Sequence, residues 1–119
     1  MISGRLYSPY YIYIYFSNLV NAFYKILPMA ENKEESRVEY MGSLLRELLG
    51  MQKMAESVEY DTGFLSLLNI LRYLLDHADC SPEIVKQDVF KAISICNRLA
   101  NKYQTISATE VSHERVGKV

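Results

Sequence analysis

Hydrophobic residues recur along most of this chain with the spacing of helices. When each residue is advanced by about 100°, the helical increment, the apolar residues of four segments gather on one side each. These segments span residues 8–28, 31–56, 61–78 and 81–103. Ser8-Pro9 opens the first and Ser81-Pro82 the last, and serine followed by proline is a strong helix-start signal. The pattern therefore predicts an all-α protein.

The apolar side of each predicted helix indicates which residues form the core. Helix by helix, the expected core residues are Ile12, Tyr15, Phe16, Leu19, Val20, Ala22, Phe23, Ile26 and Leu27; Val38, Met41, Leu44, Leu45, Leu48, Leu49, Met51 and Ala55; Phe64, Leu67, Leu68, Leu71, Leu74, Leu75 and Ala78; and Val85, Val89, Ala92, Ile93, Cys96, Leu99, Ala100 and Tyr103. Pro28 is expected to end the first helix, and Asp61 or Thr62 to cap the third.

The N-terminal apolar run allows other interpretations. Residues 11–16 are rich in tyrosine and isoleucine, which favour strands. However, both alternating sets are apolar and no second strand is available, so a helix is the better interpretation. A membrane span needs about 20 mostly apolar residues, and polar residues interrupt this run at Ser17, Asn18, Asn21 and Lys25. No cleavage site for a signal peptide follows it, so we predict neither a membrane span nor a signal peptide.

Short connections between the four helices predict that neighbours in sequence pack antiparallel. We therefore expect an up-down four-helix bundle, formed as a single helical domain by residues 1–103. Residues 104–119 are polar and lack periodicity, which predicts a flexible C-terminal tail. Two positions in the second helix stay open. Gly50 could kink it, and Gln52 could either hydrogen-bond within the apolar face or face water.

Composition narrows the functional classes. The chain has 119 residues and a formal net charge of −1, which argues against a broad electrostatic surface for nucleic acid or anionic membrane. Two cysteines without a CxxC motif do not make a disulfide-rich secreted scaffold. A reduced, cytoplasmic setting is the default expectation.

Candidate catalytic or metal chemistry is weak. His77 and Cys80 are three residues apart, a spacing that could place two metal ligands together on a helix. His77, however, falls on the polar side of its helix, and Cys80 belongs to the following turn. Cys96 sits among apolar positions, where a thiol usually only fills space. No nucleophile motif, zinc motif or phosphate-binding loop is present, so we predict a protein that is not an enzyme and holds no cofactor or metal.

A basic strip on the last predicted helix is a candidate anion-binding site. Lys91, Arg98 and Lys102 share one outer face, where they could contact phosphate or an acidic partner. The same cations also suit the C-terminal half of a solvated helix. Few residues near the start of that helix are suited to reading bases, so nucleic acid is not the favoured partner.

The aromatic supply of the first helix is less usual. Its apolar arc is wider than one side of a bundle needs, and tyrosine and methionine are enriched at protein interfaces. The residues expected to point outward and bind a partner are Tyr11, Tyr13, Ile14, Tyr24, Tyr40, Met54 and Phe90. The first hypothesis is a non-catalytic protein-interaction module that forms a homodimer, such as a regulator, chaperone, immunity factor or adaptor. The alternative is a nucleic-acid- or phosphate-binding regulator that uses the basic strip.

Overall fold

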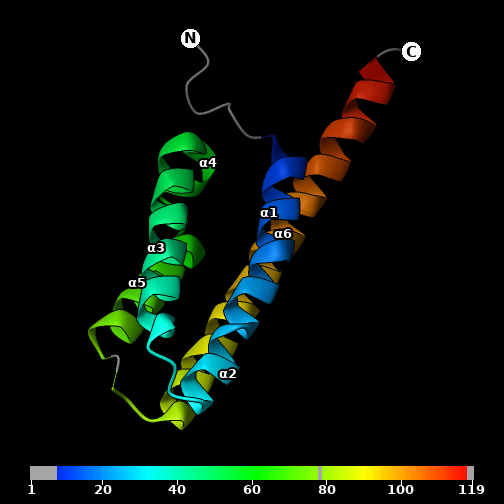
Figure 1. Cartoon of the computed structure of the whole chain (residues 1–119). Coiled ribbons are helices and arrows are strands. Elements are labelled where there is room, and N and C mark those ends of the chain that lie inside the picture. Colours follow the sequence, from blue (N-terminus) through cyan, green and yellow to red (C-terminus); the bar gives the residue numbers. More distant parts are fainter. Residues whose placement is uncertain (1–7, 78, 118–119) are drawn as a thin grey trace.

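The computed structural model describes residues 8–77 and 79–117, with side chains except at 54, 56 and 110–117 (Figure 1). Within this part of the chain all regular structure is helical, so the predicted all-α class is confirmed. The helices are α1 (Pro9–Tyr24), α2 (Ile26–Glu31), α3 (Ser36–Met54), α4 (Glu56–Glu59), α5 (Thr62–Asp76) and α6 (Pro82–Gly117).

The predicted helix starts at Ser8, Asp61 and Ser81 are confirmed by their hydrogen bonds. Ser8 Oγ accepts from the Tyr11 N–H at 3.3 Å, and Asp61 Oδ1 accepts from the Gly63 and Phe64 N–H groups at 2.8 and 3.2 Å. Ser81 Oγ accepts from the Ile84 N–H at 3.4 Å. Each cap satisfies a backbone donor that the first turn of a helix leaves without a partner.

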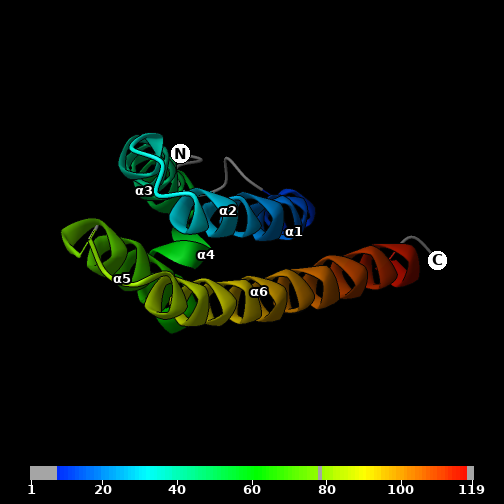
Figure 2. The same cartoon turned by 60° about the horizontal axis from the view of Figure 1, so that its bottom comes forward.

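The long helices α1, α3, α5 and α6 run in alternating directions along the chain (Figure 1). Helix α1 packs chiefly against α6, whereas α3 packs chiefly against α5, and α5 also packs against α6. Helix α2 continues the line of α1 and contacts both α6 and α3. This uneven pairing does not establish the predicted four-helix bundle. The line of contact between α1 and α6 runs along one side of the molecule (Figure 2).

The centre of the core is an aromatic cluster that joins four helices. Phe16 of α1 is completely buried and packs edge-on against Phe64 of α5, with ring centroids 6.2 Å apart. The ring of Tyr103 of α6 stacks on Phe16, with ring centroids 6.3 Å apart. The Tyr103 hydroxyl donates to the backbone oxygen of Ser57 in α4 at 3.1 Å. A polar tip that finds a partner lets a tyrosine serve as a core residue.

Several sequence-based boundaries differ from the structure. The first helix does not end at Pro28: α1 ends at Tyr24, and Pro28 lies in the first turn of α2, where its missing N–H costs nothing. The next helix starts at Ser36 instead of near residue 31, since a turn separates α2 from α3. Gly50 neither ends nor splits α3. Gln52 is half-buried, and its Nε2 donates to the Glu59 backbone oxygen at 3.0 Å, which ties α3 to the end of α4.

Two side chains and the C-terminal segment also depart from expectation. Val38 was expected in the core and is 44 % exposed, because it lies beside a surface cavity in the first turns of α3. Ile95 is buried, although its helical phase points it outward. Helix α6 continues to Gly117 and so includes most of residues 104–119, the segment predicted as a flexible tail. Ala78, expected in the core, lies outside the described residues.

The turn between α2 and α3 places a lysine in the left-handed backbone region. Lys33 has φ 53°, and it follows Asn32, which ends α2. The Glu34 N–H donates to the Met29 oxygen at 2.9 Å, and the Lys33 N–H donates to the Ala30 oxygen at 3.2 Å. These two bonds form a Schellman motif, in which the left-handed residue is usually glycine. Lysine is therefore held in a conformation that its Cβ disfavours.

Replacing Lys33 with glycine should raise the free energy of unfolding by roughly 0.5–1 kcal/mol. Relief of the left-handed backbone strain outweighs the greater freedom that glycine gives the unfolded chain. Urea unfolding measures the change. Lys53→Gly is the matched control, because Lys53 lies in the last turn of α3 and glycine there should lower stability by about 1 kcal/mol. A loss of stability in Lys33→Gly comparable to that of the control would contradict the strain argument.

Candidate functional site

Two exposed aromatic rings from different helices meet on the surface. Tyr24, the last residue of α1, is 45 % exposed, and Phe90 of α6 is 43 % exposed. Their rings make an edge-to-face contact with centroids 6.2 Å apart. Both residues were predicted to face a partner, and the structure brings them together. The contact exists because α1 and α6 pack antiparallel, which sets the end of α1 beside the first turns of α6.

Two more tyrosines lie on the same side of α1, nearer to its start. Tyr13 precedes Tyr24 by close to three helical turns, so the two lie on nearly the same side of α1. The Tyr13 ring lies 6.1 Å from that of Tyr10, which is well exposed. We call the surface formed by Tyr10, Tyr13, Tyr24 and Phe90 the aromatic seam. Tyr10 was missed in the sequence analysis, although its spacing of fourteen residues from Tyr24 places it on the same face.

The remaining predicted partner residues do not join the aromatic seam. Tyr11 is exposed, but its phase puts it on the opposite side of α1 from Tyr13, and Ile14 is half-buried on a third side. Tyr40 is half-buried, and its hydroxyl donates to the Ala22 backbone oxygen at 2.8 Å. Burial, together with the charge of Glu47, raises the pKa of Tyr40 above its ordinary value. Tyr40 therefore joins α3 to α1 within the fold. The side chain of Met54 lies outside the described residues.

The basic strip of α6 is divided by contacts with acidic groups. Lys102 Nζ lies 2.6 Å from Asp61 Oδ2, and this hydrogen-bonded pair raises the pKa of Lys102. Partial burial alone would raise the pKa of Asp61, but hydrogen bonds from Lys102 and from the Phe64 and Gly63 N–H groups lower it overall. The ion pair thus connects Asp61, the N-cap residue of α5, to α6.

The three cations of the strip border two different hollows. Arg98 and Lys102 share a hollow of about 210 Å³ with Asp61. Lys91 lines a separate hollow of about 280 Å³ together with Asp88. Because each hollow also contains a carboxylate, the strip does not offer three cations to one anion.

His77 and the two cysteines have separate structural surroundings. The His77 ring stacks on Tyr73 at 4.1 Å, and its Nδ1 lies 2.9 Å from the Tyr73 backbone oxygen. Cys80 is half-buried in the loop between α5 and α6. Cys96 is fully buried, and desolvation raises the pKa of its thiol to about 12. Among the described residues, no three His, Cys, Asp or Glu side chains gather as a metal-ligand set.

The two cysteines should differ in reactivity with iodoacetamide. Because the thiolate is the reactive form, the raised pKa and the burial of Cys96 should keep it unmodified in the folded protein at pH 8. The partly exposed Cys80 should react instead. Mass spectrometry of peptides from native and urea-unfolded samples measures this. Native Cys80→Ala should take up no label, and equal labelling of both cysteines in the native wild type would show that the core around Cys96 opens freely.

Comparison with protein-family models, with curated proteins and with solved structures finds no match for this chain. None of the described helices combines the length and the apolar character needed to cross a bilayer.

Proposed function

We propose that this protein is a non-catalytic interaction module that self-associates through the aromatic seam. The observation that carries the proposal is the exposed ring pair of Tyr24 and Phe90, contributed by two different helices. Aromatic residues are enriched at interfaces and dominate their energetics, because they bury a large area at a low cost in side-chain entropy. In a monomer the pair is exposed to solvent, so it does not gain the stabilisation that burial in an interface would give.

The chemistry of α1 favours a second copy of the chain as the partner. Helix α1 contains no charged residue from Pro9 to Tyr24, although one side of it is exposed. The cores of interfaces are depleted in charge, and an uncharged surface can meet its own copy without like-charge repulsion. The net charge of −1 also adds little repulsion between two chains.

A two-fold arrangement makes use of the spacing along α1. In a two-fold dimer the same patch meets itself, so two α1 helices run antiparallel. With the axis between Tyr13 and Tyr24, Tyr13 of one copy then lies beside Tyr24 of the other. Their hydroxyl groups can reach water at the rim while the rings pack. In this proposal the four long helices form an up-down bundle, and its α1–α6 side faces the second copy.

Replacing both Tyr24 and Phe90 with alanine should weaken self-association by more than about 2 kcal/mol, or about 30-fold in the dissociation constant. Both rings are lost from the centre of the proposed contact, while the core residues of α1 and α6 remain. Sedimentation velocity over a range of protein concentrations measures the dissociation constants. Circular dichroism of both variants checks that helical content is unchanged.

Tyr60→Ala is the matched control, because Tyr60 is 80 % exposed and lies in the turn before α5, outside the two helices that form the aromatic seam. This control should associate like the wild type. A dimer that survives the double substitution would move the contact to another face. A wild-type monomer at high micromolar concentration would refute self-association.

A further inference from the structure

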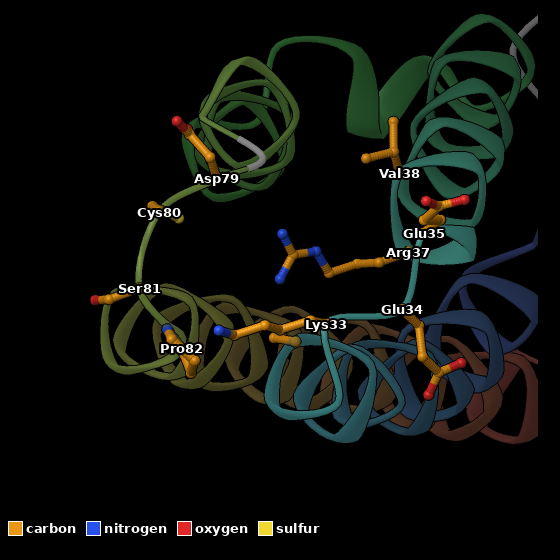
Figure 3. A pocket seen from close by; sticks show the side chains of 10 residues that line it. Lys33, Glu34, Glu35, Arg37, Val38, Asp79, Cys80, Ser81 and Pro82 are labelled. Atoms are coloured by element: carbon orange, nitrogen blue, oxygen red, sulfur yellow. The ribbon is translucent and has the colours of Figure 1, made fainter.

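A cavity of about 470 Å³ opens at the end of the molecule where α3 and α6 begin (Figure 3). Its walls come from residues 30–38, which join α2 to α3, and from residues 79–82, which join α5 to α6. A volume of this size lies within the range of small-molecule pockets. It shares no residue with the aromatic seam, so it raises a separate question about function. We call it the end cavity.

Positive side chains point into the end cavity, whereas the carboxylates in its wall point away. Figure 3 shows the Arg37 guanidinium in the middle of the cavity and the Lys33 ammonium group extending toward Pro82. The carboxylates of Glu34, Glu35 and Asp79 are directed outward in the same view. The two cations are therefore the charged groups of the wall that face the interior.

Arg37 is placed for binding rather than for solvation. It is the one buried charged residue of the described chain, with 9 % of its surface exposed. It also takes part in another interaction within the protein. A guanidinium carries five N–H donors in a rigid fork, so it can serve that interaction and an anion together.

Lys33 supplies an independent observation. Its left-handed backbone is the one that a Schellman turn requires, and glycine would adopt it without strain. The lysine side chain is therefore present at a cost in stability. That cost is accounted for if the ammonium group at the mouth of the end cavity has a use.

We propose that the end cavity binds a phosphate group, either as free phosphate or as a phosphate monoester. Two cations facing one interior match the charge of a phosphate, which is about −1.5 to −2 near neutral pH, better than that of a single carboxylate. The N-terminus of the long helix α6 begins at Pro82 in the wall and adds a partial positive charge. The apolar surface of Val38 and Pro82 lies beside the cations and can contact the organic part of a monoester.

The test uses two-dimensional NMR titration of the whole protein with inorganic phosphate, phenyl phosphate and acetate at constant ionic strength. Saturable shifts in residues 30–38 and 79–82 are expected with both phosphate compounds, with a dissociation constant of about 1 mM or tighter. Equal affinity for the two would identify free phosphate as sufficient, whereas tighter binding of phenyl phosphate would identify the monoester. Acetate binding as tightly as phosphate would overturn the assignment, as would the absence of saturable shifts.

Variants of Arg37 and Lys33 test whether these two cations bind the phosphate. Arg37→Gln and Lys33→Gly should each weaken phosphate binding by about tenfold, because each removes a charge-assisted contact. Lys53→Gln removes the same charge at the far end of α3 and should leave the affinity unchanged. If Arg37→Gln does not fold, Lys33→Gly still decides, since it is expected to be more stable than the wild type. Wild-type affinity in Lys33→Gly would contradict the proposal, and neither result depends on the aromatic seam.

Discussion

Replacing Phe16 with alanine should lower the free energy of unfolding by about 3–5 kcal/mol, which is the usual cost of truncating a buried phenylalanine. Phe16 is completely buried, and its ring contacts both Phe64 of α5 and Tyr103 of α6. The substitution leaves a void between three helices whose backbones are held apart by these rings. The void can close only if the helices shift, because protein interiors are packed as densely as organic crystals.

Urea unfolding monitored by circular dichroism measures this change. Tyr60→Ala is the control, since it removes an aromatic ring that is 80 % exposed and should change stability by no more than about 0.5 kcal/mol. The hydrogen bond from the Tyr103 hydroxyl to the Ser57 backbone oxygen belongs to the same cluster. Its loss in Phe16→Ala would be a second sign that the core is disturbed. A Phe16→Ala protein as stable as the control would place the centre of the core elsewhere.

Replacing Leu71 with alanine should lower the free energy of unfolding by about 2–5 kcal/mol. Leu71 is completely buried on the face of α5 that also carries Leu67 and Leu74. This face meets both α3 and α6, so a shortened side chain removes contacts on two sides. The midpoint of urea unfolding reports the loss if the slope of the transition is unchanged.

Leu65 offers a matched control on the same helix. It is exposed to 36 % of its surface, so Leu65→Ala removes the same atoms from a site already in contact with water. Its cost should be well below that of Leu71→Ala. Similar costs at the two positions would mean that α5 is rotated about its axis from the orientation described.

The helical faces and caps could be predicted from the sequence because they depend on local spacing. The buried residues of α5 and α6 repeat every three to four positions, and Asp61 and Ser81 cap the helices they precede. The burial of Ile95 could not be predicted from local spacing. Its phase points outward, but the start of α5 comes close to α6 at Gly63, where an added Cβ would lie 3.5 Å from Ile95 Cγ2. Burial there depends on a neighbouring helix and not on periodicity.

The candidate sites likewise combine features that local spacing predicts with features that depend on how the helices pack. The exposed tyrosines of α1 could be predicted, because the apolar arc of that helix is wider than a core requires. The pairing of Tyr24 with Phe90 could not, since it depends on the register of α1 along α6. The end cavity left no local signal. Lys33 and Arg37 read as ordinary surface cations until the turn between α2 and α3 and the loop before α6 are brought together.

Self-association of the proposed kind requires that a second copy of the chain covers the aromatic seam. The most direct measurement is an isotope-filtered nuclear Overhauser experiment on a mixture of labelled and unlabelled protein, which detects only contacts between chains. We expect contacts from the Tyr24 ring of one chain to the Tyr13 ring of the other. Contacts confined to a different surface, such as the exposed Tyr73 and Ile84, or no contacts between chains at concentrations well above micromolar, would contradict it.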